Sequence, residues 1–437
     1  MIRFSRLLQP FEEFFRHQAS GGVVLLLATV LALALANSPW AGFYHHFWEV
    51  EFTIGVAGFG LTQSLHHWIN DGLMAVFFFV VGLEIKRELL AGELASLRKA
   101  ALPIAAAVGG MVVPALIFLT LDPHQPEARG WGIPMATDIA FALGVVALLG
   151  DRVPRSLAIF LTALAIVDDL GAVAVIALFY AGEIALLPLV AAALLLSLLV
   201  AGNRLGFKDP AFFGVLGLAL WLAVLQSGVH ASIAGVLVGA TIPVRSRHGS
   251  TAFLAQARQM EREYVETETI PGPFAREERL GILLAWERLC HDAMSPLQRM
   301  EHLMHDWIVF GVMPLFALAN AGIPLSLDEL QASISHPVTR GVGLGLLLGK
   351  PLGIVLFTWV AVRLKLCELP AGVEWRQVLG IGILGGIGFT MSLFITSLAF
   401  DQATLIADAK VGIFAASLIA GIAGYLLLRR SSGPPTA

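Results

Sequence analysis

The chain carries little charge for its length. Only 14% of its 437 residues are Asp, Glu, Lys or Arg, whereas 57% are hydrophobic. Soluble domains carry roughly 25% charged residues, so this composition excludes an ordinary soluble fold. The small net charge of −4 also excludes a strongly basic surface, and we expect no nucleic-acid partner.

Cysteine is scarce as well. The chain has two cysteines, Cys290 and Cys367, and they lie far apart in the sequence. They predict neither a disulfide framework nor a metal cluster. We expect no resident cofactor and no enzyme activity.

Long apolar runs dominate the chain instead. Such runs, about 20 residues long, are typical of an all-α polytopic membrane protein, because helices satisfy their own backbone hydrogen bonds in lipid. The seventh and eighth runs are short and are joined at Ser227 and Gly228, so the count of spans can differ by one. About twelve spans are expected, at residues 20–36, 69–90, 101–121, 131–149, 156–181, 186–201, 211–226, 229–243, 302–322, 341–363, 377–399 and 409–428.

The distribution of basic residues predicts the orientation. With twelve spans, both termini share a side with most loops that contain Lys and Arg. Only Arg129, Arg340 and Lys410 fall on the opposite side. Because cytoplasmic loops carry an excess of Lys and Arg, both termini are expected in the cytoplasm.

Two segments between the spans look soluble. Residues 49–63 alternate apolar and polar side chains with glycines among them, which predicts a small outer β-hairpin. An isolated hairpin is marginally stable in water, so we expect it to pair with a second copy of itself. The cytoplasmic segment 245–300 is charged and helix-prone on both sides of an interruption at residues 270–273. It is either a solvated linker with two surface helices or a regulatory module.

Two adjacent acids lie deep in the fifth span. Asp168 and Asp169 are the only charged residues between Arg155 and Glu183. At a rise of about 1.5 Å per residue, they lie ~20 Å from either flanking charge. An ionised acid at this depth costs at least ~2.5–3.5 kcal/mol, so the pair needs a cation or protons to neutralise it. A single buried Asp can be a hydrogen-bonded packing residue, but two neighbouring acids favour a functional site.

Other polar residues lie equally deep. In the fourth span, Pro134 breaks or kinks the helix. The backbone carbonyls freed there, together with the oxygens of Thr137 and Asp138, suit a small hard cation. The same two residues could instead cap a broken half-helix. Lys350 lies in the middle of the tenth span, where its natural partner is a buried carboxylate, unless its side chain extends to the membrane surface.

The eleventh span is rich in glycine, which permits either close helix packing or an unwound stretch. Its mid-span glycines are Gly382, Gly385, Gly386 and Gly388.

The fourth and eleventh spans, the two that look interrupted, are each the middle of a triplet of spans. Discontinuous helices at matching places in two halves predict an inverted-repeat transporter, with its site between the repeats. We expect a single domain, 1–437, with core repeats at 101–181 and 340–429.

The polar stretches together resemble the NhaA-type sodium/proton antiporters. The matching segments occur in the family's order from the second to the eleventh span. They are 77–89, 136–144, 163–172, 227–236, 301–305, 315–322, 349–353 and 386–394. The segment 245–300 is longer than the connection found in the best-known members. It directly precedes residues 301–305, so the coupling of that cluster to the ion site is the part of the resemblance that is least certain to apply.

The resemblance implies roles for individual residues. Asp168 and Asp169 would bind the transported Na+ or Li+ and the protons, with Asp169 the more direct ligand, and Lys350 would pair with Asp168. Thr137 and Asp138 would lie where the two broken helices cross, and Asp71 near the cation entrance. The second broken segment would include Gly385, Gly386, Gly388 and Thr390. The pH-sensing residues would be Glu84, Arg87, Glu88, His230, Glu301, His302 and His305, although His230 could equally be a packing residue.

The family further implies secondary antiport in a bacterial inner membrane. The resemblance also implies regulation by pH and a homodimer formed through 49–63. From the charge of the buried site, we hypothesise that two protons enter for each sodium or lithium that leaves. A cation channel is the nearest alternative, but a lysine in the pathway disfavours it. A membrane-embedded prenyltransferase would also use paired aspartates, yet it needs an Asp-Asp-x-x-Asp pattern, and Asp169 is followed by Leu-Gly-Ala.

Overall fold

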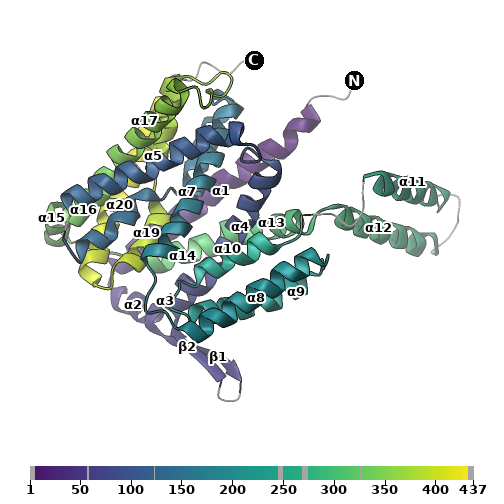
Figure 1. Cartoon of the computed structure of the whole chain (residues 1–437), viewed down its shortest axis with the longest axis horizontal. Helices are drawn as coiled ribbons and strands as arrows, with labels where there is room; N and C mark the ends of the chain where they lie inside the picture. The colour runs from purple at the N-terminus through teal and green to yellow at the C-terminus, as the bar shows by residue number, and fades with distance from the viewer. Residues whose placement is uncertain are drawn as a thin grey trace.

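The computed structural model of the chain is a bundle of helices with one two-stranded sheet (Figure 1). The structure describes residues 5–56, 59–122, 124–244, 250–267, 274–324 and 326–431. The predicted class, a mostly helical membrane protein with a small hairpin, is confirmed.

Eight helical segments in the described ranges are long and apolar enough to cross a membrane. They are Leu65–Ala91, made of α3 (Leu65–His67), η1 (Trp68–Leu73) and α4 (Met74–Ala91); α5 (Leu97–Leu121); Glu127–Leu149, made of η2 (Glu127–Met135) and α6 (Ile139–Leu149); α7 (Arg155–Phe179); α8 (Leu186–Arg204); Pro296–Asn320, made of α13 (Pro296–Trp307), η5 (Ile308–Val312) and α14 (Met313–Asn320); Pro337–Arg363, made of α16 (Pro337–Leu344), η6 (Gly345–Gly349) and α17 (Lys350–Arg363); and α20 (Ala403–Ser431).

Two bent pairs raise the number of candidate spans to as many as ten. In one, α1 (Ser5–Ala36) turns by 112° into α2 (Ala41–Glu49); in the other, α18 (Trp375–Gly385) turns by 45° into α19 (Phe389–Ala399). The apolar helices α9 (Pro210–Leu225) and α10 (Ser232–Thr241) are shorter, with 16 and 10 residues. Every apolar run expected from the sequence falls on one of these elements, but their lengths alone do not establish twelve spans.

The predicted outer hairpin is present. Strand β1 (Glu51–Val56) pairs antiparallel with β2 (Phe59–Ser64), so that Phe52 lies opposite Gln63; the two turn residues, 57 and 58, are outside the described part. The hairpin projects from the end of the bundle (Figure 1). The Trp68 indole donates a 2.9 Å hydrogen bond to the Phe52 carbonyl and so ties β1 to the start of the second span.

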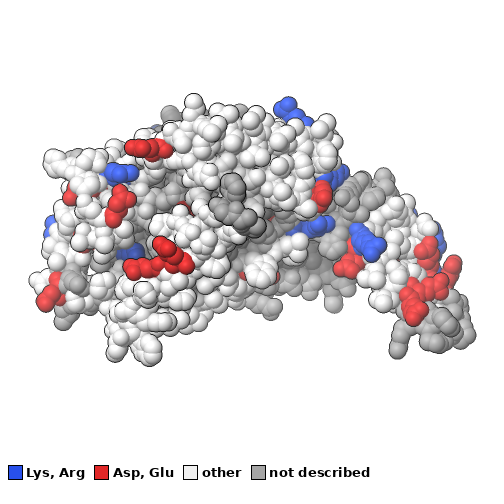
Figure 2. Space-filling model, turned by 90° about the horizontal axis from the view of Figure 1, so that it is seen from below, with Lys and Arg blue, Asp and Glu red and all other residues white. Residues whose placement is uncertain are grey.

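The second soluble segment forms two helices, α11 (Ser250–Glu266) and α12 (Phe274–Ala293), as the sequence predicts; the expected interruption at 270–273 lies outside the described residues. The pair projects sideways from the bundle (Figure 1). Figure 2 shows charged side chains on this projection, whereas most of the neighbouring body surface on that face is uncharged. The short helices α15 (Leu327–Ser335) and η3 (Gly150–Arg152) complete the fold.

The helices α5 and α17 cross closely in the core. A Cβ atom on Gly109 would lie 2.1 Å from the Gly353 carbonyl oxygen, and one on Gly353 would lie 2.0 Å from the Gly109 carbonyl oxygen. Only glycine at both positions permits this approach, because the obstacle on each side is backbone. The crossing brings the first core segment, α5 to α7, against the second, α16 to α20.

Candidate cation site

The two interrupted spans meet at their breaks. Residues 136–138 separate η2 from α6, and residues 386–388 separate α18 from α19. The backbone N–H of Asp138 donates a 2.7 Å hydrogen bond to the Ile387 carbonyl, which joins the two breaks directly. Pro134 lies one residue before the end of the first half-helix, and its missing N–H donor removes a hydrogen bond from this last turn. At Gly386, a Cβ atom would lie 2.5 Å from the Leu346 carbonyl oxygen, so close backbone packing fixes the second break.

The Asp138 carboxylate accepts hydrogen bonds from the N-terminal ends of both half-helices that begin at the breaks, α6 and α19. Its Oδ1 accepts a 3.0 Å hydrogen bond from the Phe141 N–H, which makes Asp138 the N-cap of α6. Its Oδ2 accepts a 3.1 Å bond from the Thr390 N–H and a shorter one from the Thr390 hydroxyl. The capping interpretation of Asp138 therefore holds. Because two positive helix ends share one carboxylate, both of its oxygens are already occupied.

Asp168 is paired with Lys350 inside the protein. Both side chains are 0% exposed, and Lys350 Nζ lies 2.8 Å from Asp168 Oδ2. Lys350 also donates to the Met135 carbonyl at the end of η2. The Thr137 hydroxyl donates to Asp168 Oδ2 at 2.8 Å, with the Gly385 carbonyl as its alternative acceptor at 3.0 Å. The lysine side chain therefore does not extend to the membrane surface.

Asp169 differs from its neighbour in having neither Lys350 nor Thr137 as a hydrogen-bond partner. It is 3% exposed, and within the described residues its Oδ1 has no hydrogen-bond partner. Asp168 Oδ1 is also buried and unpartnered there, but Asp168 Oδ2 accepts from both Lys350 and Thr137. A buried carboxylate oxygen without a donor is costly, which favours binding of a cation or a proton. Asp169 is therefore the more available of the two acids.

A narrow cavity of about 100 Å³ leads to Asp169. Asp138 also lines it, and Glu84, Arg87, Glu301 and His305 line it as well. The walls come from α4, α6, α7 and the α13–η5 helix. The cavity thus connects the acidic pair with a cluster of ionisable side chains at the Arg87 end of α4.

This ionic cluster collects most of the residues matched to pH sensing. The Arg87 guanidinium forms an ion pair with Glu301 and lies 3.2 Å from a Glu88 oxygen. Glu88 also accepts a 2.9 Å hydrogen bond from the Glu93 N–H, just beyond the end of α4. His305 shares the cavity wall, whereas His302 is exposed on α13 and does not line it.

His230 and Asp71 form a separate pair. His230 Nε2 lies 3.7 Å from an Asp71 oxygen, and its other ring nitrogen is 3.0 Å from the Ser232 hydroxyl. The imidazole packs edge-on against the Phe394 ring, with centroids 5.5 Å apart. Neither His230 nor Asp71 lines the cavity beside Asp169. The packing interpretation of His230 therefore fits its surroundings.

Freed backbone carbonyls in the fourth span were expected from the sequence, but not which side chains would bind them. The Met135 carbonyl accepts from Lys350, and the Ile133 carbonyl accepts from Ser392 at 2.8 Å. Both carbonyls belong to the tight helix η2, where the break at 136–138 leaves them without the usual partners. Neither Lys350 nor Ser392 is close to these carbonyls in the sequence, so no local pattern indicated the pairing.

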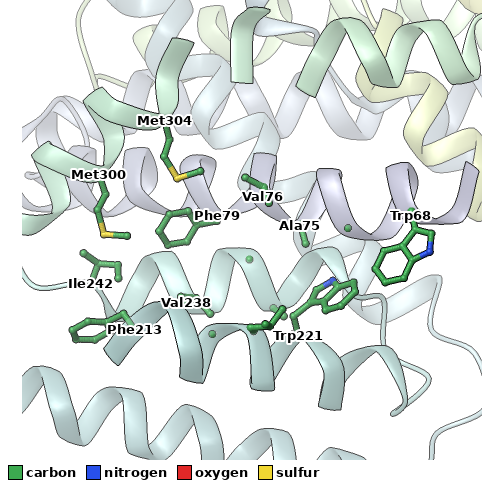
Figure 3. Close-up of a pocket in the computed structure, with 16 residues that line it drawn as sticks. Trp68, Ala75, Val76, Phe79, Phe213, Trp221, Val238, Ile242, Met300 and Met304 are labelled. Atoms are coloured by element: carbon green, nitrogen blue, oxygen red, sulfur yellow. The ribbon is translucent and has the colours of Figure 1, made fainter. Parts of the chain in front are cut away.

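A larger cavity of about 430 Å³ is unsuited to an ion (Figure 3). It lies between α4, α9, α10 and α13, with Trp68 and Trp221 at one end and Met300 near the other. Among the described residues that line it, none is charged. Of these two cavities, only the one at Asp169 is lined by charged side chains in the described part of the chain.

Comparisons with known proteins agree with one another. The family model described as Na+/H+ antiporter 1 matches residues 12–428. The chain is 64% identical to a protein named Na(+)/H(+) antiporter NhaA 2 from Syntrophotalea carbinolica, over 99% of this chain and 98% of the relative. It is 51% identical to an NhaA protein from Acidithiobacillus ferrooxidans over 97% of both chains, and 48% identical to one from Koribacter versatilis over 99% of this chain and 93% of the relative. The similarity extends over nearly the whole chain.

Proposed function

Because this chain belongs to the NhaA family of Na+/H+ antiporters, it is an integral membrane protein that exchanges sodium for protons, and we propose that Asp168 and Asp169 form the site at which the two compete. Its relatives are transporters rather than enzymes, which removes the prenyltransferase alternative. The observation that carries the assignment is Asp169 Oδ1, which is buried and unpartnered in the described structure, on an acid that lines the narrow cavity.

Charge balance supports a competition between sodium and protons. Asp138, Asp168, Asp169 and Lys350 sum to −2 when all are ionised, and burial makes that charge untenable without a cation or protons. Sodium bound by the free carboxylate oxygens satisfies the site in one state, and protons satisfy it in the other. The adjacent acids titrate as a coupled pair, so the two protonation steps belong to the pair rather than to one residue.

The ratio of two protons to one sodium makes exchange electrogenic. Each turnover then moves one net charge inward, and the membrane potential contributes ~2.3 kcal/mol per charge per 100 mV. In proteoliposomes with equal sodium and proton concentrations on both sides, an imposed potential is expected to drive sodium flux, measured with 22Na. Protein-free liposomes under the same potential are the control. Flux that is indifferent to the potential would show a one-for-one exchange.

The architecture that this mechanism needs is an inverted repeat with a moving site. We assign the repeats to 101–181 and 340–429 of a single domain, in twelve spans with both termini in the cytoplasm of a bacterial cell. The close α5–α17 crossing and the paired breaks support this assignment. Cys290, exposed on α12, permits a test of orientation. An impermeant maleimide that reached it from outside intact cells would contradict the assignment.

The ionic cluster around Arg87 is proposed to tune the response to pH. A protonated His305 adds positive charge to a cavity wall that already contains Arg87, and this charge opposes the approach of sodium. Replacing His305 with glutamine is therefore expected to shift the acidic limb of the activity–pH curve to lower pH. The expected shift is roughly half a unit, equivalent to about 0.7 kcal/mol. Dye dequenching in everted vesicles, recorded over a pH series, measures it.

His302→Gln is the matched control for this shift. His302 lies on the same helix but is exposed and outside the cavity, so its removal should move the curve less. Equal shifts for the two variants, or no shift for His305→Gln, would remove the cavity cluster from the mechanism.

The outer hairpin is proposed to join two copies of the chain. Its sheet has only two strands, so both β1 and β2 are edges able to pair with another strand. Phe52 and Ile54, on the same face of β1, are 52% and 54% exposed, so a pair of apolar side chains is available to a second copy.

Charging the hairpin is therefore expected to separate the copies. The double substitution Phe52→Lys and Ile54→Lys should shift the detergent-solubilised protein from dimer to monomer, as measured by light scattering on a sizing column. Leu254→Lys, at a site that is also 52% exposed but lies on α11, is the control and should leave the mass unchanged. A double variant that stays dimeric would place the interface elsewhere.

A further inference from the structure

A third cavity, of about 410 Å³, lies away from the cation site. It forms where the first turns of α5 and α7 meet the loop that follows α17. Its deep residues are apolar: Leu102, Phe160 and Ala163 are each 5% exposed or less. Cys367 is also buried there, and burial raises the pKa of its thiol, so it adds no negative charge at neutral pH. The floor of this cavity therefore suits hydrocarbon.

The mouth of the same cavity is cationic. Three basic side chains line it, Arg98, Lys99 and Lys365, against two acids, Glu93 and Glu368. Lys99 Nζ lies 3.4 Å from a Glu93 oxygen, and these two charges offset one another. Within the described residues, the side chains of Arg98 and Lys365 form no ion pair or hydrogen bond. Two basic groups are thus available to an anion, with Glu368 the remaining acid.

Lys365 occupies a position where glycine is usual. It follows the end of α17 with φ of 60°, the only positive φ at a non-glycine residue in the described chain. Its N–H donates to the Val362 carbonyl, and the Leu366 N–H donates to the Ala361 carbonyl, which closes the helix end. A lysine in this conformation is strained relative to glycine. Unlike glycine, lysine at this position places an amine at the cavity mouth.

Exposed leucines neighbour the basic residues of the mouth in the sequence, and one of them, Leu366, lines the cavity. Leu97 at the start of α5 is 89% exposed, and Leu364 and Leu366 are 64% and 62% exposed. Such side chains at the ends of membrane helices are compatible with contact to lipid at the interface. A soluble anion would find little complementarity in this mixture of exposed leucines, apolar floor and basic rim.

We propose that this cavity binds the phosphate headgroup of an anionic phospholipid, with the phosphate at Arg98 and Lys365 and the acyl chains along the exposed leucines. Basic cavities between membrane helices on the cytoplasmic side suit such headgroups, and charge-assisted hydrogen bonds from both basic groups can reach one phosphate. The bound lipid holds the first turns of α7 against the loop that follows α17. Further along, the same two helices carry Asp168 and Lys350. Binding itself does not depend on the exchange mechanism.

The test measures lipid binding rather than transport. Phosphatidylglycerol is titrated into the detergent-solubilised full chain, and the bound lipid is counted by native mass spectrometry. The variant with both Arg98→Gln and Lys365→Gln is expected to bind about fivefold more weakly for each charge removed. Arg363→Gln, which removes an exposed charge from the same end of α17 but outside the cavity, should keep the wild-type affinity. Equal affinities for the double variant and the wild type would overturn the proposal.

A second variant separates binding from folding. Lys365→Gly retains the backbone conformation at φ of 60° and removes only the amine, so its thermal stability should equal or exceed that of the wild type. Its affinity for phosphatidylglycerol should nonetheless fall about fivefold. Glycerol 1-phosphate, the soluble headgroup, is added as a competitor at millimolar concentration. If it displaces phosphatidylglycerol completely, the cavity is a site for soluble phosphates and the lipid assignment is wrong.

Discussion

Replacing Asp169 with asparagine is expected to abolish sodium/proton exchange. The substitution preserves shape but removes the charge of the acid that has a free buried oxygen and lines the narrow cavity. At a separation of 4 Å and an effective dielectric constant of 20, that charge is worth about 4 kcal/mol to a bound monovalent cation. Sodium affinity should therefore fall roughly a thousandfold. Dequenching of a pH-sensitive dye in everted vesicles, on addition of Na+ or Li+, measures the exchange.

Asp169 is a more informative position for this test than the neighbouring acids Asp138 and Asp168. Asp168 already accepts from Lys350 and Thr137, and both oxygens of Asp138 are used at the helix ends. Their replacement disturbs structure as well as binding, whereas Asp169→Asn leaves the hydrogen bonds of Lys350 and Thr137 intact. Asp401→Asn, an exposed loop acid, is the control for expression and charge. An Asp169→Asn protein that exchanges sodium with unchanged affinity would move the site away from the acidic pair.

Replacing Gly353 with alanine is expected to prevent correct packing of the core. The added Cβ would lie 2.0 Å from the Gly109 carbonyl oxygen, and backbone cannot rotate away as a side chain can. The helices α5 and α17 must separate, at a cost above the 1–3 kcal/mol typical of overpacking. Lys350 is three residues earlier on α17, so the separation also disturbs its pairing with Asp168. Thermal unfolding in detergent and sodium exchange should both be impaired.

Gly343→Ala is the matched control. It lies in the same span, and no other heavy atom lies within 4 Å of its added Cβ. Its melting temperature should equal or exceed that of the wild type, since alanine is the better helix former by about 1 kcal/mol. If Gly353→Ala melted at the same temperature as Gly343→Ala, the close crossing would not be a determinant of the fold.

Much of the fold could be predicted from hydropathy and helix-breaking residues. The apolar runs located every candidate membrane helix, because a single segment can cross lipid only as a helix, which makes its backbone hydrogen bonds internally. Pro134 located the first break within two residues, and the glycines before Thr390 located the second. The hairpin followed from its alternation of side chains. These features depend on local sequence, which is why sequence alone reveals them.

Contacts between distant elements could not be predicted in the same way. The sequence suggested one group of pH-sensing residues, but the structure places His230 beside Asp71 and leaves His302 exposed. Which face of a helix meets another depends on packing over the whole bundle. The resemblance implied that Asp138 lies where the two broken helices cross, but no local pattern indicated that its carboxylate would accept from Thr390, 252 residues away in the chain. The roles of these residues remain predictions.

The lining of the cavity at Asp169 has a consequence for hydration. Most of the side chains around it are apolar, among them Phe77, Val80 and Ile166. If Asp169 binds the transported cation, as we propose, that cation exchanges part of its hydration shell for carboxylate and other protein oxygens there. Mg2+ gives up its waters reluctantly and demands near-ideal octahedral geometry. Such a site would therefore select against Mg2+ at the dehydration step, before any difference in contacts with the acidic pair.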